Sequence, residues 1–167
     1  IKLSQEGEPE IWNAIRFAIM NLGDGYEPPE TPLTSATPGL PPASKWALHR
    51  LNTAVKTTVD AMEVYDFANA TTGVYAFWQY DVCDVFIELM KPVMNGTDEV
   101  AKSATRDTLW TCLDAGLRLL HPFMPFVTEE LWQRLPRRAA ETAPSIMVAD
   151  YPAFTDDRTD AAVEESM

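Results

Sequence analysis

The stretch HPFMPFVTEELWQRL, residues 121–135, decides the fold of this chain. Pro122 ends a helix, because its ring clashes with the preceding turn and its nitrogen has no hydrogen to donate. Pro125 fits the first turn of a new helix, where that hydrogen would have no partner. Glu129 and Glu130 then lie near the positive end of the new helix dipole. The stretch predicts a helix, a sharp corner and a second helix whose buried face carries Leu131, Trp132 and Leu135.

Upstream of this corner, apolar residues recur at steps of three and four, the spacing of helices with a buried face. This spacing predicts four main helices and the short closing one, over about residues 11–22, 44–62, 67–90, 98–120 and 126–135. The fourth has apolar residues on more than one face, which predicts that it lies at the centre of the fold. The expected fold class is therefore all-α, a helical bundle of four main helices plus a short closing helix.

Local signals add detail to these helices. Ser44 is predicted to cap the second helix through its side-chain oxygen, and the third is predicted to stop before Pro92. Apolar residues at 145–149 predict a short extended segment. The residues predicted to point inward on the third helix are Tyr75, Trp78, Val82, Val85 and Leu89. The large aromatic anchors predicted to fill the core are Trp46, Trp78, Trp110 and Trp132.

Two segments lack the helical spacing. Residues 26–43 contain six prolines among Ser, Thr and Gly, a composition that predicts an extended surface loop. In residues 141–167, seven acidic residues outnumber one arginine, and little apolar content follows Phe154. Such composition predicts an acidic, flexible C-terminal tail. The expected division is a helical bundle over residues 1–152 and a tail over residues 153–167.

The formal net charge of the chain is −12, which argues against strong non-specific binding of nucleic acid because phosphate contacts depend on Lys and Arg. Half of the excess negative charge lies in residues 141–167. A small basic patch and weak binding therefore remain compatible with the rest of the chain. No apolar run is long enough for a membrane span, and the well-separated Cys83 and Cys112 fit a reducing compartment. The expected location is cytoplasmic.

No catalytic or metal site is expected in this chain. His49 and His121 are the only histidines, and neither stands in a spacing that binds zinc or a di-iron centre. The sequence has no glycine-rich phosphate loop and no Gly-x-Ser-x-Gly elbow. The predicted catalytic residues, metal ligands and cofactors of this chain are therefore none.

Several blocks together resemble a known family. Residues 121–136, HPFMPFVTEELWQRLP, are similar to the segment that closes the anticodon-binding bundle of class I aminoacyl-tRNA synthetases in the valine, isoleucine and leucine group. Residues 12–18 resemble the first helix of that bundle, residues 44–51 resemble the start of the second, and blocks within residues 65–92 match the third. The resemblance covers roughly residues 11–152 and is strongest to valyl-tRNA synthetases of the cytosolic eukaryotic type.

The resemblance implies a C-terminal anticodon-binding domain fragment of valine–tRNA ligase, which attaches valine to tRNA(Val) using ATP. The catalytic signatures of that family, His-x-Gly-His and Lys-Met-Ser-Lys-Ser, are absent, so the fragment alone should be inactive. ATP and Mg would be used by the catalytic domain of the parent enzyme. The implied partners are the tRNA(Val) anticodon stem–loop and the catalytic and editing domains, with no membrane. A protein partner of the acidic surface stays open.

Arg16 is the first candidate for tRNA binding, because the family's first helix meets the anticodon loop and a guanidinium can pair with phosphate or stack on a base. The alternative for Arg16 is a salt bridge across the bundle to Asp81 or Asp84. Asn13 offers a donor and an acceptor to a base edge, or is simply exposed. Tyr26 could stack on a base or cover the core. A basic run could bind phosphates or form a solvated helix face, and it consists of Lys45, His49 and Arg50.

Two alternative functions stay open. One is the anticodon-binding bundle of an isoleucyl- or leucyl-tRNA synthetase, which discrimination of the valine anticodon would exclude. The other is a non-catalytic, synthetase-derived helical module that binds a protein. A start codon just before Ile1 would favour that module, whereas upstream nucleotide-binding and editing segments would exclude it. Residues 1–10 are acidic where the family usually has a basic entry, which would weaken independent tRNA binding.

Overall fold

The computed structural model describes the backbone of residues 8–160 and the side chains of residues 11–160. No strand occurs within this part of the chain. The predicted all-α class is therefore confirmed. The elements are α2 (Glu8–Leu22), α3 (Pro42–Glu63), α4 (Phe67–Ala76), the π-helix η1 (Phe77–Phe86), α5 (Ile87–Met94), α6 (Glu99–Leu120), α7 (Pro125–Trp132) and the 3-10 turns η2 (Ile146–Val148) and η3 (Asp156–Arg158).

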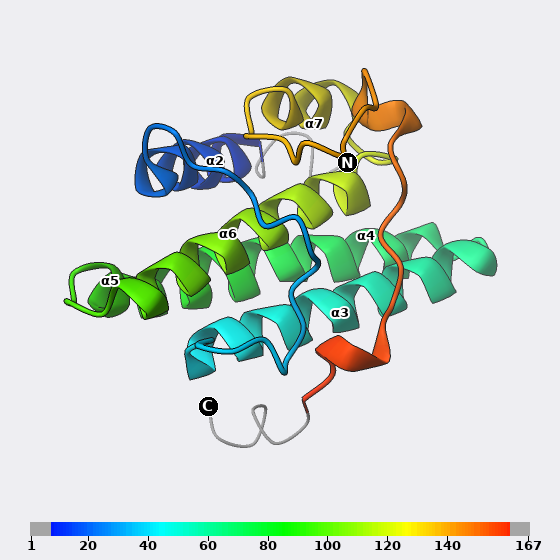
Figure 1. The fold of residues 1–167 in the computed structure, drawn as a ribbon. Coiled ribbons are helices and arrows are strands. Elements are labelled where there is room, and N and C mark those ends of the chain that lie inside the picture. The colour runs from blue at the N-terminus through cyan, green and yellow to red at the C-terminus, as the bar shows by residue number, and fades with distance from the viewer. Residues whose placement is uncertain (1–7, 161–167) are drawn as a thin grey trace.

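Helix α6 lies at the centre of the bundle, as its apolar pattern predicts. Figure 1 shows α2 and α7 on one side of α6, and α3 with the α4–α5 segment on the other. Helix α6 contacts α2, α3, α4, α5 and α7. Asp98 caps its first turn by accepting hydrogen bonds from the backbone nitrogens of Val100 and Ala101. The predicted core anchors Trp46, Trp78, Trp110 and Trp132 are all buried, and they are confirmed.

The helix predicted over residues 67–90 is longer than expected. Elements α4, η1 and α5 form one continuous helical segment that ends at Met94, and Pro92 lies inside α5. The prediction that the helix stops before Pro92 is therefore wrong. A proline this close to a helix C-terminus removes one backbone hydrogen bond and leaves most of the helix intact. The backbone nitrogen of Asn95 still donates to the carbonyl oxygen of Lys91 at 3.0 Å, which closes the last turn.

The π-helix η1 changes which side chains of this segment point inward. Trp78 and Val82 are buried as predicted, whereas Leu89 is 38% exposed. Phe86 and Met90 fill the core beyond Val82 instead. A π-helix bonds each residue to the fifth along the chain, so it turns less per residue than the α-helix assumed in the prediction. The inward face therefore shifts by one position along the rest of the segment.

Gly116 of α6 allows this π-helix to pack closely. The indole nitrogen of Trp78 donates to the carbonyl oxygen of Gly116 at 3.2 Å. A Cβ atom at position 116 would lie 2.9 Å from Cζ2 of Trp78 and 3.1 Å from Cε1 of Phe77. Real Cβ atoms do not make contacts this short with rigid rings. The two aromatic rings therefore occupy the space that any other side chain at position 116 would need.

Gly116→Ala is expected to lower the free energy of unfolding by about 1–3 kcal/mol, because the added methyl overpacks the core. Gly73→Ala in α4 is the matched control, since its Cβ would make only an ordinary 3.4 Å contact with Cγ2 of Thr57. Alanine favours a helix over glycine by about 1 kcal/mol, so this second variant should be neutral or more stable. Urea unfolding measures both. Equal changes in the two variants would contradict the packing argument.

Two local predictions from the sequence are wrong. Helix α3 begins at Pro42 rather than after Ser44, because a proline needs no partner for a backbone N–H in the first turn. Ser44 is buried within that turn, and its hydroxyl has no hydrogen-bond partner. Residues 145–149 form a 3-10 turn instead of an extended segment. The hydroxyl of Ser145 accepts from the backbone nitrogen of Met147 and starts this turn.

The segment 153–160, predicted to belong to a flexible tail, lies against α3. The Asn52 side chain donates to the carbonyl oxygen of Thr155 at 2.8 Å and accepts from the Thr155 nitrogen at 3.0 Å. The backbone nitrogen of Asp160 donates to Nδ1 of His49 at 3.1 Å. The buried Asn52 amide thus bonds to both the backbone nitrogen and the backbone carbonyl oxygen of Thr155. These two bonds hold the segment against α3 despite its acidic composition. The remainder of the predicted tail, and the acidic entry at residues 1–10, lie outside the described side chains.

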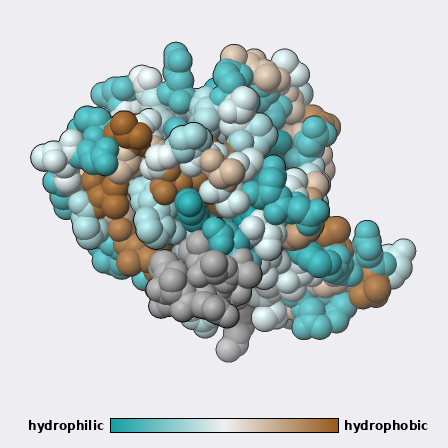
Figure 2. All heavy atoms as spheres, turned by 60° about the horizontal axis from the view of Figure 1, so that its bottom comes forward, coloured by the Kyte–Doolittle hydropathy of each residue, from teal (hydrophilic) through white to brown (hydrophobic). Residues whose placement is uncertain are grey.

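The turn between α3 and α4 leaves large apolar side chains exposed. Tyr65 has a left-handed backbone (φ 61°), and the next nitrogen, of Asp66, donates back to Ala61 at 2.8 Å. The exposed side chains here are Val64, Tyr65 and Phe67. Figure 2 shows this side of the bundle, with hydrophobic atoms in a strip at the left and in smaller areas at the right, and hydrophilic atoms between them.

Candidate nucleic-acid interface

A groove of about 390 Å³ runs between α2 and α7. It combines exposed apolar side chains with two arginines, a combination suited to stacking on bases and pairing with phosphates. We call it the α2–α7 groove. Its lining residues are Trp12, Ile15, Arg16, Ile19, Met20, Leu131 and Arg134.

The register of α2 decides which residues reach this groove. Its inner face packs into the core through Ile11, Ala14, Ile15, Ala18 and Leu22. Trp12 stands next to Ile11 and is apolar, but its side chain is 37% exposed. Ala14, two residues further, takes the core position instead. Trp12, Asn13 and Arg16 therefore all lie on the outer part of α2.

Trp12 is held by a residue of the turn that follows α7. The guanidinium of Arg134 lies over the Trp12 ring, 5.0 Å from its centre. Arg134 also pairs with Glu130 one turn earlier, with an Nη2–Oε1 distance of 2.5 Å. A cation over an indole is attracted by the negative face of the ring. The contact joins the two walls of the α2–α7 groove and orients the exposed ring.

Arg16 is exposed, and within the described part of the chain it forms no ion pair. The salt bridge considered as an alternative, to Asp81 or Asp84, is not formed by Arg16. Asp81 instead pairs with Arg50, with an Nε–Oδ1 distance of 3.1 Å. The guanidinium of Arg16 is thus available at the edge of the α2–α7 groove, next to the equally exposed Asn13.

The predicted residues on α3 do not join this groove. Figure 1 places α3 across α6 from α2. His49 is 7% exposed and accepts a hydrogen bond from Asp160, and Arg50 pairs with Asp81. Lys45 is half-buried on the same helix. The structure thus gives His49 and Arg50 roles within the bundle and separates all three residues from Arg16.

Tyr26 packs with its hydroxyl turned toward α6. That hydroxyl donates to Oδ1 of Asp107 at 2.8 Å. Burial and this hydrogen bond raise the pKa of Tyr26 well above its ordinary value. Burial also raises the pKa of Asp107, although the bond from Tyr26 acts in the opposite direction. Tyr26 therefore links the start of the proline-rich loop to α6, outside the set of residues that lines the α2–α7 groove.

Sequence reasoning missed Trp12, Met20 and Arg134 as groove residues. Trp12, Arg16 and Met20 stand at steps of four, so they share one helix face. That spacing could have shown a face mixing aromatic, basic and flexible apolar side chains beside the fully apolar stripe. Arg134 could not have been found this way, because its contact with Trp12 joins α2 to the turn after α7, far away in sequence.

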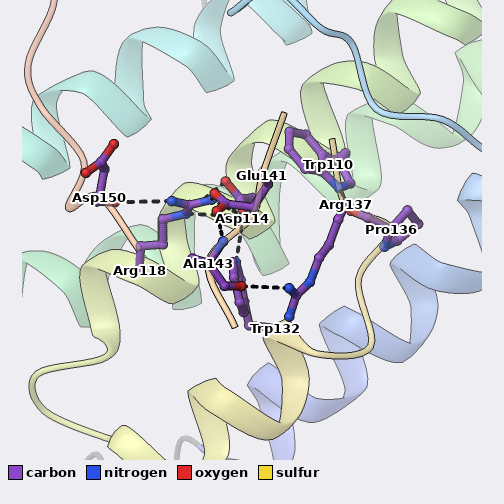
Figure 3. A network of polar contacts seen from close by, with 9 residues as sticks. All are labelled: Trp110, Asp114, Arg118, Trp132, Pro136, Arg137, Glu141, Ala143 and Asp150. Carbon is purple, nitrogen blue, oxygen red and sulfur yellow. Dashed lines mark hydrogen bonds and ion pairs between the residues drawn. The ribbon is translucent and has the colours of Figure 1, made fainter. Parts of the chain in front are cut away.

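A polar network fixes α7 against α6 and so supports the groove (Figure 3). The indole nitrogen of Trp132 donates to Oδ1 of Asp114 at 2.8 Å. The Trp132 ring lies between two guanidinium groups, 5.4 Å from Arg118 and 4.3 Å from Arg137. Arg118 also pairs with Asp114 at 3.1 Å and with Glu141 at 2.8 Å. The network thus joins α6, α7 and the segment that follows α7.

The charges of this network stabilise one another. Burial disfavours the charged form of Arg118, but Asp114 and Glu141 together raise its pKa. Burial likewise opposes ionisation of Glu141, yet hydrogen bonds from the Ala143 nitrogen and from Arg118 lower its pKa. Arg118 and Glu141 are thus both ionised at neutral pH.

Residues 8–160 contain no group of three or more His, Cys, Asp or Glu side chains placed to hold a metal ion. No helix in the same part of the chain is long and apolar enough to cross a membrane. Cys83 and Cys112 form no disulfide with each other. The arrangement that stands out chemically is therefore the mixed aromatic and basic lining of the α2–α7 groove.

Comparison with known proteins identifies the family of this chain. Residues 44–167 match the family described as the anticodon-binding domain of tRNA ligase. The chain is 46% identical over 160 residues to a valine–tRNA ligase of Homo sapiens. The matched region covers 93% of this chain and 12% of the relative. It is 46% identical over 162 residues to the mitochondrial valine–tRNA ligase 1 of Arabidopsis thaliana, covering 95% of this chain and 14% of the relative.

A bacterial relative shows similar identity. The valine–tRNA ligase of Geobacter sulfurreducens is 48% identical over 149 residues, covering 89% of this chain and 16% of the relative. The chain thus spans less than a fifth of the length of these three relatives. The family match includes α3 to α7, which form most of the described bundle. The chain therefore belongs to the family of anticodon-binding domains of tRNA ligases.

Proposed function

We propose that this chain is the anticodon-binding part of a valine–tRNA ligase and that it holds the anticodon loop of tRNA(Val). Identity of 46–48% to valine–tRNA ligases of animal, plant and bacterial origin supports the choice of valine over isoleucine or leucine. The remainder of the enzyme would attach valine to the tRNA using ATP and Mg. The location would be cytoplasmic, and the partners would be the tRNA and the catalytic and editing domains.

The α2–α7 groove is the surface that we assign to the anticodon loop. An exposed indole such as Trp12 provides a platform for an unpaired base. Arg16 lies one turn along the same helix and can pair with a phosphate or with a base edge through its parallel N–H groups. Asn13 offers one donor and one acceptor beside them. The single observation that carries this assignment is an exposed Trp12 in one groove with an Arg16 that forms no ion pair within the described residues.

The strongly negative charge of the chain limits how tightly this piece alone would bind RNA. The affinity of proteins for nucleic acid rises with the number of phosphate contacts from Lys and Arg. The α2–α7 groove contains two arginines, one of which is paired with Glu130. Base stacking and base-edge contacts would therefore provide discrimination, while the rest of the enzyme would provide most of the affinity.

The test is a titration of the purified domain with a valine anticodon stem–loop at low salt, followed by NMR. Trp12→Ala is expected to weaken binding about tenfold, because stacking of one base on an aromatic side chain contributes about 1–3 kcal/mol. Arg16→Gln should also weaken binding and should reduce its dependence on salt. Lys91→Gln, on α5 and paired with Glu88, removes the same charge outside the groove and is the control.

Anticodon specificity is tested with a second stem–loop in which the middle anticodon base is changed. Shifts centred on α2 that weaken with this change would support recognition of the anticodon. Equal binding to an isoleucine or leucine anticodon would favour one of the other two synthetases. Absence of binding by the folded domain at millimolar RNA would contradict the proposal and favour a helical module that binds a protein partner through its acidic surface.

A further inference from the structure

A second hollow, of about 360 Å³, lies beside the polar network of Figure 3 and outside the α2–α7 groove. Its lining brings together the end of α7, the middle of α6, the proline-rich loop and the C-terminal segment. We call it the arginine pocket. The lining residues that matter here are Glu30, Trp110, Arg137, Arg138, Asp150 and Arg158.

Arg138 is held in this pocket by an aromatic ring. Its guanidinium lies over Trp110, 4.8 Å from the ring centre. The Trp110 ring is itself fixed, because its indole nitrogen donates to the carbonyl oxygen of Pro136 at 2.8 Å. The Nε atom of Arg138 is buried and has no hydrogen-bond partner. A buried donor without an acceptor costs free energy, so its presence in a pocket points to an acceptor that binds there.

Arg158 reaches the same pocket from the C-terminal segment. Its Nε donates to the carbonyl oxygen of Leu33 at 2.9 Å, which leaves the other guanidinium nitrogens free to bond elsewhere. Burial lowers the pKa of Arg158, and the positive charge of Arg138 acts in the same direction. The positive charges of Arg138 and Arg158 are therefore close enough to repel each other. The negative charge of Asp157 acts in the opposite direction and favours the charged form of Arg158.

Four arginines and four carboxylates line the pocket, and among its described residues the ion pairs join only Arg118 to Asp114 and Glu141. Within residues 8–160, none of Arg137, Arg138 and Arg158 has a carboxylate oxygen within 4.0 Å, whereas Arg118 next to them has two carboxylate partners. Glu30 and Asp150 also line the pocket, but neither forms an ion pair there. Arg137 satisfies two of its nitrogens with neutral groups, the carbonyl oxygen of Ala143 and the amide of Gln133. Three neighbouring cations in a partly enclosed space favour an anion with several oxygens.

We propose that the arginine pocket binds a phosphate group, with Arg138 and Arg158 as its two principal donors. Guanidinium groups bind phosphate through pairs of parallel N–H bonds, and Arg138 and Arg158 both line the pocket. The phosphate could belong to an RNA backbone or to inorganic phosphate, since both present the same oxygens. The proposal does not depend on the assignment of the α2–α7 groove, which lies elsewhere and has different lining residues.

The first experiment titrates the domain with inorganic phosphate against sodium chloride of equal ionic strength. The indole N–H of Trp110 and the Nε–H of Arg138 and Arg158 are followed by NMR. Saturable shifts of these signals are expected in the millimolar range. Arg138→Gln and Arg158→Gln should each weaken binding about tenfold, because charge-assisted hydrogen bonds to phosphate are among the strongest in proteins. Lys91→Gln, which removes an exposed cation of α5 outside both the arginine pocket and the α2–α7 groove, should leave phosphate binding unchanged.

Folding of each variant is checked by circular dichroism. Arg138→Lys is added because it keeps the charge but loses the Nε donor, so it should weaken phosphate binding less than Arg138→Gln does. Shifts that grow linearly with phosphate, or that are the same in all four variants and the parent, would overturn the proposal.

The second experiment separates the two sources of phosphate. If the pocket binds an RNA backbone, the anticodon stem–loop should shift the Trp110 and Arg138 signals, and added inorganic phosphate should reverse those shifts. If it binds free phosphate, the same signals should respond to phosphate and ignore the RNA. A third outcome is that RNA shifts only signals of α2, while neither RNA nor inorganic phosphate shifts the signals of the arginine pocket. This result would refute the phosphate site but would still support the proposed anticodon function.

Discussion

Trp132→Ala is expected to lower the free energy of unfolding by about 3–5 kcal/mol, the cost usually measured when a buried tryptophan is truncated. The Trp132 side chain lies at the end of α7, is 2% exposed and belongs to the hydrophobic core. Its removal would leave a large cavity and would take away the ring on which Arg118 and Arg137 stack. It would also remove a hydrogen bond to Asp114. Equilibrium unfolding in urea measures the change.

Phe126→Ala, on the same short helix, is the matched control. Phe126 is 89% exposed, so its truncation removes almost no buried surface. Its effect should lie within about 0.5 kcal/mol of zero, as for most surface substitutions. A loss of several kcal/mol for both variants would mean that α7 is fragile as a whole and would contradict a specific anchoring role of Trp132.

Asp114→Ala is expected to lower the free energy of unfolding by about 2–3 kcal/mol. Two buried donors lose their acceptor in this variant, the indole nitrogen of Trp132 and the Nε of Arg118. A charged donor left partly unpaired in a buried place costs more than the average hydrogen bond contributes. Arg118 keeps Glu141 and the carbonyl oxygen of Asp150, which holds the loss below that of an isolated buried charge.

Glu130→Ala serves as the comparison, because it also removes one carboxylate that pairs with an arginine. The Glu130 and Arg134 side chains are 57% and 53% exposed, so this ion pair is screened by water. Such pairs typically contribute 0–1 kcal/mol. The ratio of the two effects, rather than either alone, tests the argument. Equal losses would show that burial of the Asp114 network adds nothing.

Helix ends were the part of the fold most accessible from sequence. Asp98 begins α6 and α6 stops just before Pro122, because capping oxygens and proline rings act on adjacent backbone. The start of α3 was predicted incorrectly from Ser44. Ser44 is a good cap by composition, but Pro42 two residues earlier starts the helix without a side-chain cap.

The inward face of the α4–α5 segment could not be predicted from its own spacing. Phe86 and Met90 are buried there and Leu89 is exposed because ten residues adopt the wider π-helical turn, while Val85 packs partly buried against the core. That turn is compatible with the rest of the fold because Gly116, on another helix, leaves room for two aromatic rings. Gly116 lies 38 residues from Trp78 along the chain, so no local pattern contains this determinant.

The structure places the predicted tRNA-binding residues in different parts of the bundle. Arg16 was chosen through the family resemblance, and the structure leaves it exposed in a groove. His49 and Arg50 were chosen because they are basic and adjacent, but their partners, Asp160 and Asp81, are distant in sequence. A run of basic residues shows what could bind a phosphate. It does not show which of them the fold already occupies.

The contacts between the C-terminal segment and the proline-rich loop affect how the domain fluctuates. Both the nitrogen and the hydroxyl of Ser35 donate to the carbonyl oxygen of Asp157 at 2.9 Å, and Arg158 donates to Leu33. Neither segment has a long helix of its own to hold it in place. Each therefore depends on the other, and separation of one exposes the backbone of both. The two segments should open and close as a single cooperative unit, although more than 100 residues separate them along the chain.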